Sequence, residues 1–148
     1  MNINELVLDE DILINVVCEN KEEVIMKLVE NLDKNNHVNS KEKCYEDILA
    51  RENQLSTGVG QGIAIPHTQS SSVKECKVSI AKLKDSVEWE TLDGTDVKIV
   101  ILITVPIESQ ESHLKILESL AEKLMDEALC KDLHNATTIK EIINVLEE

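Results

Sequence analysis

One nine-residue run, VKIVILITV at 97–105, restricts the fold more than any other part of the sequence. The run is almost continuously apolar and rich in β-branched residues, and Pro106 ends it. A strand with this pattern is buried on both faces, as in sheets that helices cover on each side. The sequence therefore predicts a central strand inside a layered α/β domain.

The segments around this strand show helical and strand-like patterns in turn. Apolar residues spaced three and four apart predict helices over 21–35 and 41–53, a longer helix after Ser109, and a last helix over 137–147. Asn20 and Ser40 are suitable N-caps for the first two helices.

A second strand is predicted from Cys76 onward. Cys76, Val78 and Ile80 alternate with polar residues, and the phase then shifts to Ala81 and Leu83. The shift indicates a bulge or a strand covered on both faces. We expect one domain over residues 1–148, a three-layer α/β fold in which helices flank both faces of a mixed β-sheet.

The charge of the chain excludes some partners. Fifteen basic and 29 acidic residues give a net charge of −14, which repels nucleic-acid phosphates and anionic membranes. The longest apolar run, IVILI, is too short to span a bilayer, and the N-terminus has no basic region typical of a signal peptide. We expect a cytoplasmic protein without nucleic-acid partners or direct membrane insertion.

The four cysteines are expected to be ordinary thiols. Cys18, Cys44, Cys76 and Cys130 lie far apart and form no C-x-x-C pair. This spacing favours neither a zinc ribbon nor a disulfide framework.

The stretch LSTGVGQGIAIPH at 55–67 is unusual for this chain, because it holds three of the four glycines and one of the two prolines. Glycines at alternate positions can turn backbone N–H groups inward to form an anion-binding nest. Pro66 restricts the backbone just before His67. The pattern predicts a rigidly presented imidazole beside an anion site. The alternative is a plain bend followed by an ordinary turn histidine.

Known nucleotide motifs do not account for this stretch. The G-x-G-x-x-G pattern would need glycine where Ile63 stands, and no Gly-Lys-Ser/Thr sequence of a P-loop is present. The chain has fourteen lysines but a single arginine, Arg51. A lone arginine is consistent with a site that needs a planar fork for two phosphate oxygens, although a chance surface position is the alternative.

These residues resemble a known family. The stretch ARENQLSTGVGQGIAIPHTQ is similar to the signature of the fructose/mannitol-type enzyme IIA domains of the bacterial phosphoenolpyruvate-dependent sugar phosphotransferase system (PTS EIIA type 2). The similarity continues through VEWETLDGTDVKIVILITVP and ESHLKILESLAEKLMD and covers essentially the full chain.

The resemblance implies a phosphotransferase component. His67 would accept a phosphoryl group, on Nε2, from the phosphocarrier protein HPr and pass it to a cysteine of a sugar-specific IIB component. Arg51 and His113 match the family's other active-site residues. The loop beside the site would comprise Ser56, Thr57, Gly58, Gly60 and Gly62. No metal or cofactor is required, and the IIB and IIC components are expected in trans.

Two other functions stay open. The nitrogen-related branch of the same family modulates protein partners according to its phosphorylation state. A metalloenzyme using His67, His113 and a cysteine has no recognisable ligand spacing. His37 and His134 are interpreted as a connector and a helix-end residue, and Trp89 as a packing residue. Fructose, mannitol and related sugars or polyols all fit, because a IIA domain contacts protein partners and not the sugar.

Overall fold

The computed structural model describes residues 6–147, apart from the side chains of residues 109, 110 and 112–114. A six-stranded sheet has the order β1-β5-β6-β3-β2, and β4 also pairs with β6. The strands are β1 (Ile12–Val16), β2 (Gly58–Gly60), β3 (Ile63–Ala64), β4 (His67–Gln69), β5 (Lys77–Val87) and β6 (Val97–Val105). β5 runs antiparallel to β6, whereas β3 and β4 run parallel to it, so the sheet is mixed as expected.

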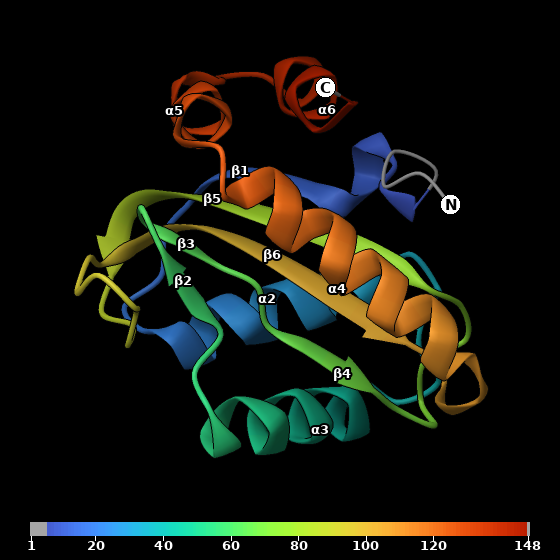
Figure 1. Cartoon of the computed structure of the whole chain (residues 1–148). Coiled ribbons are helices and arrows are strands. Elements are labelled where there is room, and N and C mark those ends of the chain that lie inside the picture. The colour runs from blue at the N-terminus through green and yellow to red at the C-terminus, as the bar shows by residue number, and fades with distance from the viewer. Residues whose placement is uncertain (1–5, 148) are drawn as a thin grey trace.

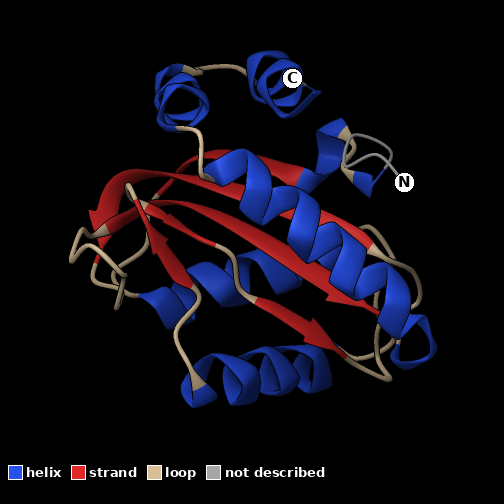
Figure 2. Ribbon diagram, viewed as in Figure 1, coloured by secondary structure: helices blue, strands red, loops and turns tan. Residues whose placement is uncertain are grey.

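Helices cover both faces of the sheet, as Figure 1 and Figure 2 show. α2 (Lys21–Lys34) and α3 (Lys41–Gln54) lie on one face. α4 (Gln110–Leu124), α5 (Glu127–Asn135) and α6 (Ile139–Glu147) lie on the other. Two 3-10 turns, η1 (Asp9–Asp11) and η2 (Ile107–Ser109), precede β1 and α4. The predicted three-layer α/β domain is confirmed.

The central strand separates two apolar cores. Ile99, Ile101 and Ile103 of β6 pack with α4, α5 and α6, whereas Val100 and Leu102 pack with α2 and α3. Full burial of each such side chain contributes about 1.5–3 kcal/mol. The continuous apolar run of β6 is therefore explained by burial on both of its faces.

β5 shows the shift in phase that its sequence predicts. Ile80 packs in the core under α4 to α6, and its neighbour Ala81 packs in the core over α2 and α3. The register of β5 against β6 also shifts between Lys82 and Val87. β5 is thus both covered on two faces and irregular.

The predicted helix starts are confirmed at two caps. The Asn20 side chain accepts a hydrogen bond from the Glu23 N–H at 2.9 Å, and Ser40 accepts one from the Lys43 N–H at 3.2 Å. The predicted helices over 21–35 and 41–53 correspond to α2 and α3 within one residue.

Several elements have no counterpart among the predicted ones. β1 joins the sheet parallel to β5, and β4 is formed by the polar residues HTQ. α5 is separate from α4 because the Asp126 side chain caps a new helix by accepting the Ala128 N–H at 2.9 Å. The last helix begins at Ile139, two residues later than predicted.

Two expectations about the chain can be compared with this fold. Every helix within residues 6–147 is too short or too polar to cross a lipid bilayer. None of the four cysteines, all of which lie within the described residues, forms a disulfide; Cys44 and Cys130 are buried, and Cys18 and Cys76 are half-buried.

Candidate active site

His67 is held by the centre of the sheet. It is the first residue of β4 and pairs with Ile103 of β6. Just before it, the Pro66 carbonyl accepts a hydrogen bond from the Ile103 N–H at 3.0 Å. Pro66 has no N–H to pair and its φ is restricted, so it suits this entry into the strand. The half-buried imidazole is therefore presented from a fixed backbone.

A hydrogen bond within the chain orients the imidazole. His67 Nδ1 lies 2.9 Å from the Ile65 carbonyl oxygen. A carbonyl oxygen only accepts hydrogen bonds, so this contact favours the tautomer in which Nδ1 carries the proton. Nε2 then keeps its lone pair, and it is the nitrogen that can act as a nucleophile.

The surroundings of His67 lower its pKa below the ordinary value of 6.5. Burial is the largest cause, because it disfavours the charged imidazolium. The Arg51 charge acts in the same direction, whereas the hydrogen bond to Ile65 and the Glu52 charge oppose it. Neutral imidazole, the nucleophilic form, therefore predominates at pH 7.

Arg51 lies in the last turn of α3, and its charge helps to lower the pKa of His67. Its Nη1 donates a hydrogen bond to the Leu55 carbonyl at 2.9 Å, which ties the guanidinium to the end of the helix. Its charge is close enough to affect the pKa of His67, so the structure brings the two predicted residues together.

A polar groove adjoins this side of β4. Its volume is about 320 Å³ and its lining includes Lys43, Arg51, Thr68, Gln69 and Ile107. Ile107 is 57% exposed, so an apolar side chain faces solvent at the edge of the groove. A guanidinium beside a neutral imidazole, next to an open groove, can receive an anionic group that a partner delivers.

Glu52 is a residue of the site that the sequence patterns did not predict. Its buried carboxylate accepts hydrogen bonds from the Thr57 N–H at 2.8 Å and the Thr57 hydroxyl at 2.5 Å. It also accepts one from Trp89 Nε1 at 3.3 Å. Glu52 therefore ties the end of α3 to the start of β2, and Trp89 is a packing residue as expected.

A helical pattern offers the signal that could have identified Glu52. The buried residues of α3 are Cys44, Ile48 and Glu52, each four residues after the previous one. An acidic residue on the buried face of a helix needs hydrogen-bond donors that are buried with it, so Glu52 could have been singled out from this spacing.

The glycine-rich stretch forms a β-hairpin from β2 and β3. Gly60, Gln61 and Gly62 turn the chain with φ values of 106°, 56° and 75°. All three φ values are positive, which explains the glycines at two of these positions. At Gly58, a Cβ atom would clash with the Glu90 carbonyl, so the third glycine is required by close packing.

The hairpin tip binds an anion that belongs to the protein itself. The Gln61 N–H donates to Asp93 Oδ2 at 2.8 Å, and the Gly62 N–H donates to the Thr95 hydroxyl at 3.1 Å. The hydrogen bond from Gln61, with those from Thr95, lowers the Asp93 pKa to about 2. The tip therefore holds a carboxylate of the β5–β6 loop and is not the predicted anion site beside His67.

The hairpin places the predicted loop residues at two ends of the sheet. Along β6, Ile63 pairs with Ile99 and His67 with Ile103. Four residues of strand separate these pairs by about 13 Å. Gly60 and Gly62 therefore lie toward the end of the sheet away from the imidazole.

The start of the glycine-rich stretch, at Thr57, pairs with the strand just before His67. The Thr57 carbonyl accepts the Ile65 N–H at 3.0 Å, two residues before His67. The Ser56 hydroxyl donates to the Glu90 carbonyl at 2.5 Å and accepts the Gly58 N–H at 3.3 Å. Of the five predicted loop residues, Thr57 contacts Glu52 and the strand just before His67, whereas Ser56 and Gly58 contact Glu90 and Thr91 of the β5–β6 loop.

The other three histidines lie in different parts of the fold. His113 falls within α4, but its side chain lies outside the described residues. His134 lies in the last turn of α5, and its Nε2 lies 2.6 Å from the Gln61 carbonyl oxygen, so it supports the hairpin. His37 belongs to a charged cluster with Glu10 and Asp11. That cluster is the group within the described residues whose side chains could together hold a metal, and it does not include His67.

Comparisons with known proteins identify the family. The family described as "Phosphoenolpyruvate-dependent sugar phosphotransferase system, EIIA 2" matches residues 5–148. The chain is 36% identical over 148 residues to the "PTS system fructose-specific EIIABC component" of Bacillus subtilis (strain 168), a match that covers 100% of this chain and 23% of that protein. The chain spans about a quarter or less of the length of the first curated relatives that it matches.

Solved structures agree with this assignment. The nitrogen regulatory protein IIA-Ntr from Neisseria meningitidis superposes with a TM-score of 0.91 at 26% identity, covering 97% of this chain and 98% of that one. IIA mannitol from Escherichia coli superposes with a TM-score of 0.78 at 27% identity, covering 95% of this chain and 98% of that one. The chain belongs to the EIIA type 2 family of the phosphoenolpyruvate-dependent sugar phosphotransferase system.

Proposed function

We propose that the chain carries phosphoryl groups from phospho-HPr to a sugar-specific IIB component in trans, with His67 as the carrier residue. The observation that supports this most is the hydrogen bond from His67 Nδ1 to the Ile65 carbonyl, which leaves Nε2 as the nucleophile. The lowered pKa of His67 keeps that nitrogen unprotonated at neutral pH. As in the family, the protein would act in the cytoplasm without a metal or cofactor.

The proposed transfer occurs in two displacements at phosphorus. In the first, the Nε2 lone pair attacks the phosphoryl group, an Nε2–P bond forms, and the bond to HPr breaks. In the second, a cysteine thiolate of IIB attacks, an S–P bond forms, and the electron pair of the broken N–P bond returns to Nε2. Such transfers depend on positioning and charge stabilisation more than on covalent machinery.

Each residue of the proposed site has a part in these steps. The Ile65 carbonyl keeps the Nδ1 proton in place, so the ring orientation is the same before and after transfer. The Arg51 guanidinium would bind two phosphoryl oxygens and stabilise their charge. Ser56, Thr57 and Gly58 would shape the loop beside the phosphoryl group. His113 is assigned to the site by family resemblance, as a hydrogen-bond donor to the phosphoryl group or a residue that orients His67.

A phosphotransfer experiment tests this proposal. The chain is incubated with phosphoenolpyruvate, enzyme I and HPr, and intact mass should show one added phosphoryl group. His67→Ala should show none, while circular dichroism should confirm that it folds. Full phosphorylation of His67→Ala would refute the assignment of His67.

A second function is a regulatory one. The TM-score to IIA-Ntr from Neisseria meningitidis, 0.91, exceeds that to IIA mannitol, 0.78. The identity of 36% to a fructose-specific component supports transport instead. Adding fructose- and mannitol-type IIB domains to the phosphorylated chain distinguishes the two. Rapid loss of phosphate to a IIB cysteine supports transport, and stable phosphorylation with every IIB tested supports regulation.

A further inference from the structure

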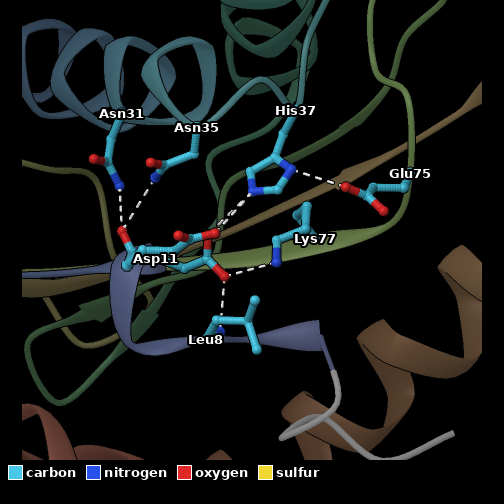
Figure 3. A network of polar contacts seen from close by, with 8 residues as sticks. Leu8, Asp11, Asn31, Asn35, His37, Glu75 and Lys77 are labelled. Atoms are coloured by element: carbon cyan, nitrogen blue, oxygen red, sulfur yellow. Dashed lines mark hydrogen bonds and ion pairs between the residues drawn. The ribbon is translucent and has the colours of Figure 1, made fainter.

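Figure 3 shows a cluster of charged side chains around His37 that phosphoryl transfer at His67 does not use. His37 Nδ1 lies 2.8 Å from Glu75 Oε1. On the other side of the ring, Nε2 lies 3.5 Å from Glu10 Oε1 and 3.8 Å from Asp11 Oδ1. Lys77 Nζ contacts the second oxygen of Asp11, Oδ2, at 2.7 Å. Three carboxylates and one ammonium therefore surround this imidazole.

The backbone fixes the position of His37. α2 ends in a cap in which Asn36 adopts a left-handed conformation, with a φ of 62°. The His37 N–H then donates to the Leu32 carbonyl at 2.9 Å, which closes the last turn of the helix. On its other side, the His37 carbonyl accepts the Lys74 N–H at 3.1 Å. The imidazole therefore projects from a fully hydrogen-bonded connector.

The Glu10 backbone and the Asp11 carboxylate are also held before any ion binds. The side-chain amides of Asn31 and Asn35 donate to the Glu10 carbonyl at 2.8 and 3.4 Å, which fastens η1 to α2. The Asp11 side chain is fully buried, and its Oδ2 accepts the Leu8 N–H at 2.7 Å. Because Oδ2 is occupied, Oδ1 is the oxygen that faces His37.

Two atoms at the centre of the cluster are buried without a hydrogen-bond partner in the described part of the chain: Asp11 Oδ1 and His37 Nε2. The Glu75 carboxylate at Nδ1 favours the tautomer with the proton on that nitrogen, so Nε2 directs a lone pair at Glu10 and Asp11. A lone pair and two carboxylate oxygens repel one another unless a cation lies between them.

The charges of the cluster point to a divalent cation. With a neutral imidazole, three carboxylates and one ammonium leave two negative charges. In a tetrahedral zinc site, bonds of about 2.0–2.2 Å place neighbouring ligand atoms about 3.4 Å apart. The separations of 3.5 and 3.8 Å from Nε2 to the two carboxylates are close to this value.

We propose that Glu10, Asp11 and His37 bind a divalent transition-metal ion of the Zn²⁺ class. One ligand atom from each residue lies within 4.8 Å of the others. An imidazole nitrogen among the ligands favours Zn²⁺ over Mg²⁺ or Ca²⁺, which prefer oxygen ligands alone. Glu75 holds the ring from behind, as carboxylates do for zinc-bound histidines. Glu10 is 50% exposed, so water can enter and complete the coordination.

The bound ion would link η1 to the end of α2. η1 leads into β1 at the edge of the sheet, and His37 connects α2 to α3. An ion that binds the folded chain only shifts the folding equilibrium toward it. The expected role is therefore to stabilise the fold, independently of phosphoryl transfer.

Cobalt(II) is the probe for this site, because its visible spectrum reports the ligands. The full chain, with its thiols reduced, is titrated with Co²⁺ and then with Zn²⁺ as competitor. We expect one equivalent of Co²⁺ to give four- or five-coordinate d–d absorption without a thiolate-to-cobalt charge-transfer band, and Zn²⁺ to abolish the signal. Zn²⁺ should also raise the melting temperature.

Three variants and one control test whether Co²⁺ binds at this cluster. His37→Gln and Glu10→Gln should each weaken Co²⁺ binding at least about tenfold, and Glu75→Gln should weaken it by about tenfold. Glu10 is on the surface, so its variant should fold even if His37→Gln does not. Glu46→Gln removes one exposed carboxylate from α3 and should bind like the wild type.

Other outcomes would overturn the proposal. A thiolate charge-transfer band would place the ion on the cysteines. Equal affinity in the wild type, His37→Gln and Glu10→Gln would place it elsewhere on the acidic surface. Absence of both a spectrum and a melting-temperature shift would mean that the cluster does not bind a divalent transition-metal ion.

Discussion

The environment of the His67 imidazole determines when its Nε2 is a nucleophile. The Ile65 carbonyl holds the proton on Nδ1, and burial with the Arg51 charge disfavours a second proton. The same Arg51 charge that lowers the pKa of the free histidine would stabilise the phosphorylated one, because a phosphoryl group carries about two negative charges. One arginine can therefore serve both states of the site.

The first prediction concerns pH. Because the pKa of His67 is lowered from 6.5, phosphoryl acceptance should stay fast at pH 6.5 and fall only as the pH drops through that lower pKa. Arg51→Gln should raise the pKa of His67, since the arginine charge lowers it. An NMR titration of the imidazole and the pH dependence of the acceptance rate measure both effects. A wild-type pKa at or above 6.5 would contradict the prediction.

The second prediction concerns the planar guanidinium group of Arg51. Arg51→Lys keeps the charge but loses the planar fork, so it should fold and transfer phosphate more slowly. Loss of one charge-assisted hydrogen bond would cost about 1.5–3 kcal/mol, or about a tenfold to hundredfold decrease in rate. Rapid-quench reactions with phospho-HPr measure the rate of phosphoryl transfer, and thermal melting checks that the variant is folded. A wild-type rate would mean that the lone arginine is a surface residue.

Sequence reasoning selected His67 and Arg51 as candidates because both stand out along the chain. His67 follows an unusual run of glycines and a proline, and Arg51 is the single arginine. Glu52 gave only a weaker signal, its position on the inward stripe of α3, because the donors that its carboxylate needs, Thr57 and Trp89, reach it only when the chain folds.

Elements with strong local patterns could be predicted, and those that depend on distant partners could not. β6 follows from a nearly continuous apolar run, and α2 and α3 follow from apolar periodicity and caps. β4 has a polar sequence and is a strand because β6 offers it a parallel edge. The glycine stretch was predicted as a nest beside His67, but its tip lies toward the other end of the sheet and holds Asp93.

The third prediction tests this assignment of the hairpin tip. Gly62 and Gly94 have similar positive φ values, 75° and 78°. A Cβ atom at Gly62 would lie 3.0 Å from the His134 ring, whereas nothing surrounds one at Gly94. Gly62→Ala should therefore destabilise the fold more than the matched control Gly94→Ala, as urea unfolding can measure.

The two glycine variants also distinguish a role of Gly62 in folding from a role in phosphoryl transfer. If the tip only shapes the hairpin, folded Gly62→Ala should accept phosphate at the wild-type rate. A folded Gly62→Ala protein with impaired acceptance would instead support a phosphate-binding role for this glycine.

At the scale of the whole molecule, the sheet carries two helical layers with different tasks. The layer of α2 and α3 supplies Arg51 and Glu52 to the candidate site. The layer of α4 to α6 packs on the opposite face and includes His134, which supports the hairpin. The contact that α5 makes through His134 is therefore separate from the hydrogen bond that orients His67.

The final prediction concerns one such contact. Lys82 of β5 is buried, and its Nζ donates to the carbonyls of Leu133 and His134 at 3.1 and 2.6 Å and to that of Ala136. Carbonyls at the end of a helix lack partners within the helix and carry partial negative charge, so an ammonium there is favourable. Lys82→Met should lower the free energy of unfolding by about 1.5–3 kcal/mol, the value of a hydrogen bond to a charged group.

The matched control is Lys84→Met, an exposed lysine two residues along the same strand, which should change stability by less than about 0.5 kcal/mol. Urea unfolding compares the two variants, and hydrogen exchange should show faster opening of α5 and α6 in Lys82→Met alone. Phosphoryl acceptance by the folded fraction should be unchanged, because Lys82 contacts the end of α5 and not the strand that carries His67. Equal stability of the two variants would show that the apolar contacts of α5 and α6 hold this layer without Lys82.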